Sequence, residues 1–204
     1  MGYDQDFYNA YKAYLQEPEV RRAHDFVFKI TSLNPNFRNV VDFGCGLFNE
    51  FYEFAKPFEY IGVDVNMSES KKNKVLVKAD YRKTDDLHSL LRTNLPGIYY
   101  SPGAFVSLFS TEITAPTDEN YKFYNGVFRK IPAIKSGLVS GFYYTSKKHQ
   151  NPIFETGGVI SYQTLENIEE VHSDVFSESR VVLPVPSEMF GKDVFEVWKF
   201  FERK

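Results

Sequence analysis

The stretch from residue 39 to residue 65 constrains the fold of this chain more than any other part of the sequence. It begins with the apolar run 40–43, whose β-branched residues are typical of a strand buried on both faces of a parallel sheet. A helix is expected over 48–56, and the apolar run 60–63 predicts a second strand. Strand, turn, helix and strand in this order predict a βαβ unit of an α/β fold.

The turn after the first strand contains two glycines. Gly44 and Gly46 flank Cys45, and because neither glycine carries a Cβ, backbone amides of the turn can approach a ligand closely. Asp42 lies two residues before the turn, and Asp64 ends the second strand at about the spacing that presents an acid to ribose hydroxyls in nucleotide-binding units. Both carboxylates should therefore reach the carboxyl edge of the sheet, where open α/β folds bind ligands. The structural alternative is that turn amides satisfy the first acid and that the second caps a helix.

Two segments of this unit resemble a known family. Residues 42–46 (DFGCG) and 60–64 (YIGVD) resemble motifs I and II of class I S-adenosylmethionine-dependent methyltransferases. The sequence departs from that family at 47–49, where its usual third small residue is missing. A dinucleotide dehydrogenase agrees less well, because its fingerprint requires a small residue at the position of Asn49.

The resemblance implies a doubly wound, mostly parallel seven-stranded sheet with helices on both faces, a C-terminal antiparallel hairpin and an N-terminal helical cap. It covers roughly 38–202 in order and is motif-specific over 40–81. We expect one domain over 1–204, with N-terminal helices over 1–37 and a Rossmann-like core over 38–204. The further expected strands are 74–79, 103–109 and 134–144, with an antiparallel pair at 180–185 and 193–201, and the further expected helices are 5–16, one from Pro18, 68–72, 84–92, 118–130 and 165–172.

The resemblance also implies S-adenosyl-L-methionine as cofactor. Its methionine end would face the glycine turn and Asp42, Asp64 would bind the ribose diol, and Asp80 would accept a hydrogen bond from the adenine amino group. A cap in a polar loop is the alternative role for Asp80. Independently of the family, carboxylates favour a cationic ligand and would repel the pyrophosphate of NAD. The implied cofactor-binding residues are Asp42, Gly44, Cys45, Gly46, Asp64, Val65, Asp80, Tyr81 and Phe109.

The sequence does not identify the methyl acceptor. It lacks the NPPY-type signature of adenine-amine and glutamine methylases and the Pro-Cys nucleophile of cytosine C5 methylases. Methyl transfer mainly requires alignment of acceptor, methyl group and sulfur, so a dedicated catalytic residue need not exist. If a base is used, the candidates are Glu112, His149 and Tyr11. In the helix from Pro18, Arg22 and His24 could also face a ligand, but we favour a solvated arginine and a helix-edge histidine.

Composition limits the remaining classes of function. A net charge of −3 and a pI near 5.9 argue against a general nucleic-acid binder. No apolar segment approaches the roughly 20 residues that span a bilayer, and the polar start predicts a cytoplasmic protein. The single cysteine excludes an internal disulfide. We therefore expect a methyltransferase that acts on a small molecule or a protein side chain, with a non-catalytic module of the same fold or an NAD(P)-binding oxidoreductase as alternatives; the oligomeric state stays open.

Overall fold

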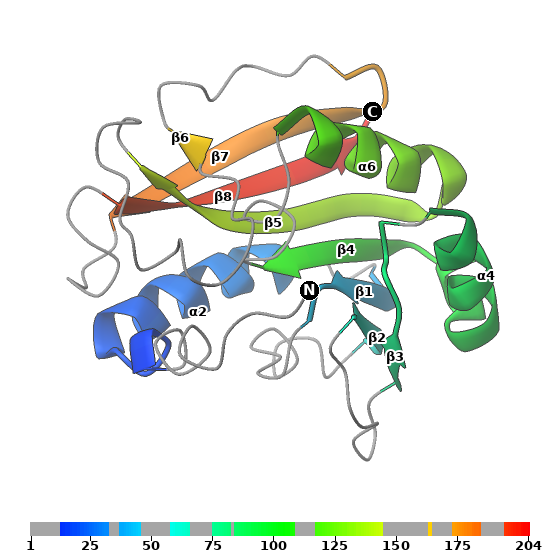
Figure 1. Ribbon diagram of the computed structural model, residues 1–204, viewed down its shortest axis with the longest axis horizontal. Helices are drawn as coiled ribbons and strands as arrows, with labels where there is room; N and C mark the ends of the chain where they lie inside the picture. The colour runs from blue at the N-terminus through cyan, green and yellow to red at the C-terminus, as the bar shows by residue number, and fades with distance from the viewer. Residues whose placement is uncertain are drawn as a thin grey trace.

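A single mixed sheet runs through the computed structural model (Figure 1). The structure describes residues 13–32, 37–45, 58–65, 75–82, 84–108, 117–144, 163–164, 173–184 and 194–204. The strands are β1 (Asn39–Phe43), β2 (Glu59–Asp64), β3 (Val75–Lys78), β4 (Gly103–Leu108), β5 (Ile134–Tyr144), β6 (Gln163–Thr164), β7 (Phe176–Pro184) and β8 (Val194–Arg203). Their order is β3-β2-β1-β4-β5-β8-β7, and β6 pairs with β5 outside this path.

The strand directions confirm the expected doubly wound sheet. Strands β1 to β5 pair with one another in parallel, whereas β8 runs antiparallel to both β5 and β7. The C-terminal hairpin is therefore present as expected. Its first strand begins at Phe176 instead of residue 180, because an edge strand tolerates the polar residues at 177–180 that conceal it in the sequence. The two-residue strand β6 was not expected from the sequence.

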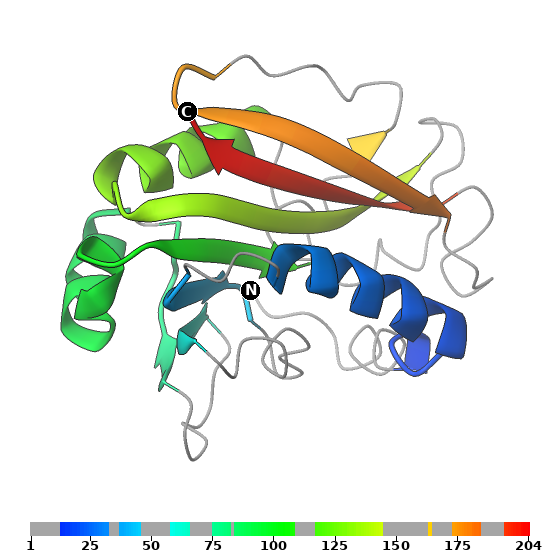
Figure 2. The same cartoon turned by 180° about the vertical axis from the view of Figure 1, so that it is seen from behind.

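Helices cover both faces of this sheet. On one face lie α4 (Thr84–Asn94) and α6 (Thr117–Lys130), and on the other lies α2 (Pro18–Ser32), as Figures 1 and 2 show from opposite sides. The 3-10 turn η1 (Pro96–Tyr99) follows α4. The expected helices at 48–56, 68–72 and 165–172 lie outside the described residues. No helix within the described part of the chain is long and apolar enough to cross a membrane.

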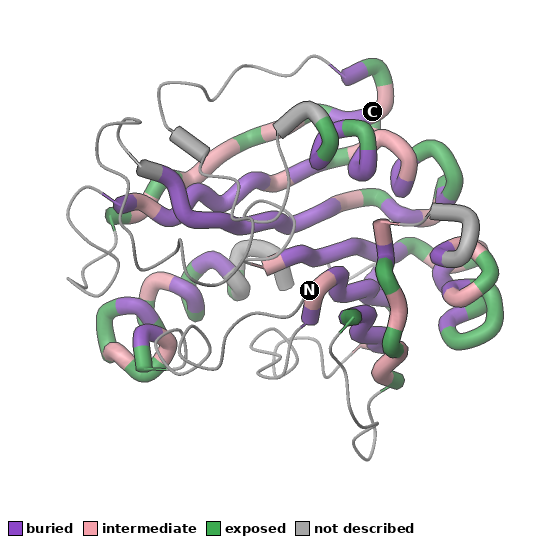
Figure 3. Tube along the Cα trace, viewed as in Figure 1, coloured by how far each residue is buried: buried purple, intermediate pink, exposed green. Residues whose placement is uncertain are grey.

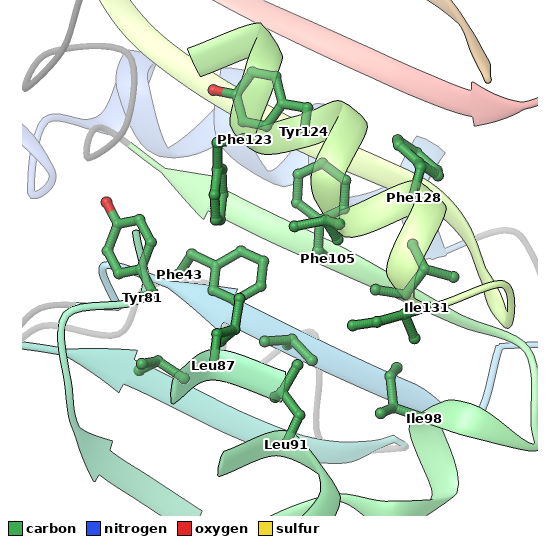
Figure 4. Packing of buried hydrophobic residues seen from close by; sticks show 14 of the residues in the cluster. Phe43, Tyr81, Leu87, Leu91, Ile98, Phe105, Phe123, Tyr124, Phe128 and Ile131 are labelled. Carbon is green, nitrogen blue, oxygen red and sulfur yellow. The ribbon is translucent and has the colours of Figure 1, made fainter. Parts of the chain in front are cut away.

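The central strands are buried on both faces, as their apolar runs predict. All five residues of β1 are buried, and Figure 3 shows buried positions along β4 and β5 as well. On the α4 and α6 face, aromatic rings fill the core around Phe105, which contacts Phe43, Tyr124 and Phe128 at centroid distances of 6.0, 5.7 and 5.6 Å (Figure 4). This dense packing fixes the strands whose ends form the site described below.

On the opposite face, α2 packs Val20, His24 and Val27 against the sheet. The interpretation of His24 as a helix-edge residue is wrong, because the residue is only 1 % exposed and its Nε2 atom contacts the Glu196 carboxylate of β8. Arg22 is exposed, as expected, and its Nε donates to the Pro18 carbonyl oxygen at 3.1 Å. The helix therefore buries one polar group in an otherwise apolar stripe.

Gly126 is a helix-interior glycine that nothing in its surroundings requires. An ideal Cβ built at this position in α6 has no neighbour within 4 Å. Because glycine costs about 0.5–1 kcal/mol relative to alanine in a helix interior, we expect Gly126→Ala to raise the free energy of unfolding by that amount in urea denaturation. Gly103→Ala is the matched control and should destabilise, since its Cβ would lie 2.8 Å from the Asn39 carbonyl oxygen. A destabilised Gly126→Ala protein would contradict the prediction.

Candidate functional site

Three acidic residues lie along the carboxyl edge of the sheet, one at or near the end of each of three adjacent parallel strands. Asp42 is the second-last residue of β1 and pairs with Gly62, Asp64 ends β2 and pairs with Lys78, and Asp80 comes two residues after β3. Because β3, β2 and β1 are neighbours in the sheet, these acids lie along one edge. This is the edge at which open α/β sheets bind ligands.

The turn after β1 is fixed to β2 by its own backbone. Gly44 has a φ of 71°, a conformation that residues with a Cβ rarely adopt. Its amide donates to the Val63 carbonyl oxygen at 2.7 Å, and the Cys45 amide reaches the same oxygen at 3.4 Å. These two hydrogen bonds therefore set the path of the turn and occupy both amides.

Cys45 is a buried packing residue of the turn. Its side chain is 7 % exposed, and an ideal Cβ at Gly62 would lie 2.7 Å from its Sγ. The thiol thus occupies the space that the missing side chain of Gly62 leaves on β2. This position agrees with the interpretation of Cys45 as a small turn residue.

The acids of β1 and β2 are both buried. Asp42 is 3 % exposed and its Oδ2 accepts a hydrogen bond of 2.7 Å from the Tyr60 hydroxyl. Asp64 is 8 % exposed, and its backbone carbonyl oxygen accepts a 3.1 Å hydrogen bond from the Ala79 amide, which ties the end of β2 to the end of β3. Val65, the next residue, is 36 % exposed. A buried carboxylate is favoured only when it is paired, and the Tyr60 hydroxyl is such a partner for Asp42.

Asp80 and Tyr81 have different surroundings. Asp80 is exposed, and its Oδ1 accepts a hydrogen bond of 3.2 Å from the Arg82 amide, as in an Asx turn. Tyr81 is buried, and its ring packs against Phe43 and Phe123 at 5.5 and 5.6 Å (Figure 4). The tyrosine ring therefore packs in the core, whereas the Asp80 side chain is exposed and bonds its own loop.

The other candidate residues from the sequence lie outside the described part of the chain. These are Gly46, Phe109, Glu112, His149 and Tyr11. Within the described residues, no three His, Cys, Asp or Glu side chains gather closely enough to hold a metal ion.

Sequence reasoning missed two residues that support the site. The first is Tyr60, which holds Asp42. The second is Ser107, a fully buried residue of β4 whose Oγ donates to the Phe43 carbonyl oxygen at 2.9 Å and so ties β4 to the start of the turn. Each is a hydroxyl within an apolar run, and this is the signal that could have identified them.

A second polar cluster lies on the α2 face of the sheet. The Glu196 carboxylate accepts hydrogen bonds from the Tyr14 hydroxyl, from the Trp198 Nε1 at 2.9 Å and from the His24 Nε2 at 2.9 and 3.0 Å. A carboxylate only accepts, so the histidine Nε2 carries the hydrogen. Glu196 pairs with Phe142, two residues beyond the point at which β4 stops pairing with β5. The cluster therefore joins α2 to β8.

The strand order, the antiparallel C-terminal pair and the glycine turn at the end of β1 together define the class I methyltransferase fold. No family model and no curated protein matches this sequence.

Solved structures match over nearly the whole chain. Magnesium protoporphyrin IX methyltransferase from Synechocystis PCC 6803, with bound SAH, is 11% identical with a TM-score of 0.56, covering 98% of this chain and 95% of its own. A SAM-dependent methyltransferase from Archaeoglobus fulgidus is 19% identical with a TM-score of 0.55, at 98% and 100% coverage. N-methyltransferase NodS from Bradyrhizobium japonicum WM9, in complex with SAH, is 11% identical with a TM-score of 0.55, at 98% and 99% coverage. At these identities the likeness shows the fold.

Proposed function

We propose that this protein transfers a methyl group from S-adenosyl-L-methionine to a small-molecule or protein acceptor. The observation that carries the proposal is the succession of Asp42, Asp64 and Asp80 along one edge of the sheet, beside a glycine turn. Carboxylates suit a ligand that combines a positive charge with hydroxyl and amine donors. Solved structures of the same fold have been crystallised with SAM or SAH, which supports the same cofactor here.

Each residue of the edge is proposed to contact a different part of the ligand. In this proposal, Asp64 accepts hydrogen bonds from the ribose diol, with Val65 beside it, and Asp42 favours the ammonium at the methionine end. The turn 44–46 lies along that end. Asp80 and Tyr81, with Phe109 as a further proposed contact, form the adenine side. The buried acids and the constrained turn fit such a ligand because they are fixed before it binds.

The chemistry asks little of the protein beyond alignment. The bound cofactor supplies a methyl group on a positively charged sulfur, which is already activated for displacement. The chain has to hold the acceptor in line with the carbon–sulfur bond and exclude competing water. If the acceptor loses a proton, Glu112, His149 and Tyr11 are the proposed bases.

Asp64→Ala tests the ribose assignment. We expect the variant to bind S-adenosylhomocysteine at least about tenfold more weakly than the parent, because two hydrogen bonds to a charged acceptor are lost. Calorimetric titration measures both affinities. Asp174→Ala is the matched control, since Asp174 is an exposed acid paired with Arg129 at the opposite edge of the sheet. Equal affinities in the parent and Asp64→Ala would remove the ribose assignment.

Two further measurements separate the proposal from its alternatives. Release of methylated product from labelled S-adenosylmethionine, with a panel of metabolites and lysate proteins as acceptors, would exclude a non-catalytic module. Thermal stabilisation by S-adenosylhomocysteine and not by NAD would exclude an oxidoreductase. Stabilisation by NAD alone would overturn the proposal.

A further inference from the structure

The bond between Tyr60 and Asp42 joins two neighbouring strands at the candidate site. Tyr60 pairs with Val40 in the parallel register, and Asp42 lies two residues farther along β1, so the two side chains share the α2 face of the sheet. The Tyr60 hydroxyl donates to the Asp42 Oδ2 at 2.7 Å, and the two residues are 7 % and 3 % exposed. A bond of this length between buried groups fixes the direction of the carboxylate.

The same strand also fixes the turn that follows Asp42. The Val63 carbonyl oxygen of β2 accepts the amide hydrogens of Gly44 and Cys45. Strand β2 therefore holds Asp42 through the Tyr60 hydroxyl and holds the turn through the Val63 carbonyl oxygen. Both parts of the site that would face the methionine end of the ligand are positioned by β2.

Packing alone does not require a tyrosine at position 60. Phenylalanine would fill nearly the same volume against Val40 and the other residues of the α2 face, and the rest of β2 between Tyr60 and Asp64 is apolar. A buried hydroxyl is costly unless it forms a hydrogen bond, and this hydroxyl bonds the acid of the site.

We propose that Tyr60 is a positioning residue whose hydroxyl holds the Asp42 carboxylate in the orientation that receives the ammonium of the cofactor's methionine moiety. This inference rests on the proposed function. It assigns Tyr60 an effect on one end of the ligand only, and leaves the ribose and adenine contacts to Asp64 and Asp80.

Two ligands that differ at that end test the assignment. S-Adenosylhomocysteine has the amino-acid moiety, whereas 5′-methylthioadenosine keeps the nucleoside and lacks it. In calorimetric titration we expect Tyr60→Phe to weaken S-adenosylhomocysteine binding by about five- to tenfold, because the acid loses a charge-assisted hydrogen bond that orients it. Binding of 5′-methylthioadenosine should change by less than about twofold, since its contacts do not involve Asp42.

Controls separate positioning from a general effect on the fold. Tyr99→Phe removes a half-buried hydroxyl that bonds His88 near the opposite edge of the sheet, and should change neither affinity. Asp42→Asn should show the same selective loss as Tyr60→Phe, and Tyr60→Phe should add nothing further in that background. If Tyr60→Phe does not fold, the affinities for the two ligands are compared in Asp42→Asn instead. An equal loss of affinity for both ligands in that variant overturns the inference.

The outcomes also distinguish this inference from the function on which it rests. If the parent binds both ligands and Tyr60→Phe weakens both equally or neither, the positioning role is overturned while the cofactor assignment stands. If the parent binds neither ligand, the proposed function fails and the inference fails with it.

Discussion

Replacing Glu196 by alanine is expected to lower the free energy of unfolding by about 3–5 kcal/mol, which urea denaturation measures directly. The carboxylate is 2 % exposed and accepts hydrogen bonds from Tyr14, His24 and Trp198. Its removal leaves three buried donors without this acceptor, and each unsatisfied group costs about 1–3 kcal/mol. Glu202→Ala, an exposed acid on the same strand, is the control and should stay within about 0.5 kcal/mol of the parent.

A second set of variants separates the cost of the unsatisfied donors from the cost of lost packing at position 196. Adding Tyr14→Phe and His24→Leu to Glu196→Leu removes two of the donors together with the acceptor. Because apolar replacement of a whole buried polar group is often close to neutral, the triple variant should be more stable than Glu196→Leu alone. A triple variant less stable than the single one, or a loss below about 1 kcal/mol in Glu196→Ala, would show that the donors find other partners.

The centre of the parallel half of the fold could be predicted because β1, β2 and β4 are almost wholly buried. Such strands are mostly apolar runs in the sequence, and the acids at or near their last residues mark the carboxyl edge; Asp42 and Asp64 were located in this way. The C-terminal hairpin was predicted as well, but the start of β7 was not, because the polar residues of an exposed edge strand resemble a loop.

Contacts between distant residues could not be predicted from local patterns. His24 and Glu196 are 172 positions apart, and each taken alone is typical of a solvent-facing residue. Only the packing of α2 on β8 brings them together. The hydrogen bond between Tyr60 and Asp42 likewise depends on the register of β1 against β2, which local sequence patterns do not determine.

The second large effect is expected at Gly137, where alanine should lower the free energy of unfolding by about 1–3 kcal/mol through overpacking. Gly137 lies opposite Phe105 in the parallel pairing of β4 and β5. An ideal Cβ at this position would come within 3.0 Å of the Phe105 ring. The ring is fully buried and stacks with Tyr124 at 5.7 Å and with Phe201 at 6.2 Å, so it cannot move aside without disturbing its neighbours.

Phe105→Leu provides the test of this mechanism. Alone, it should destabilise the protein by removing ring contacts from the core, as large-to-small substitutions do. In the Gly137→Ala background the smaller side chain leaves room for the new methyl group, so the double variant should lose less stability than the sum of the single losses. A favourable coupling of at least about 0.5 kcal/mol in a double-mutant cycle is expected. Additive losses would show that the strain at Gly137 arises in the backbone and not in its contact with the Phe105 ring.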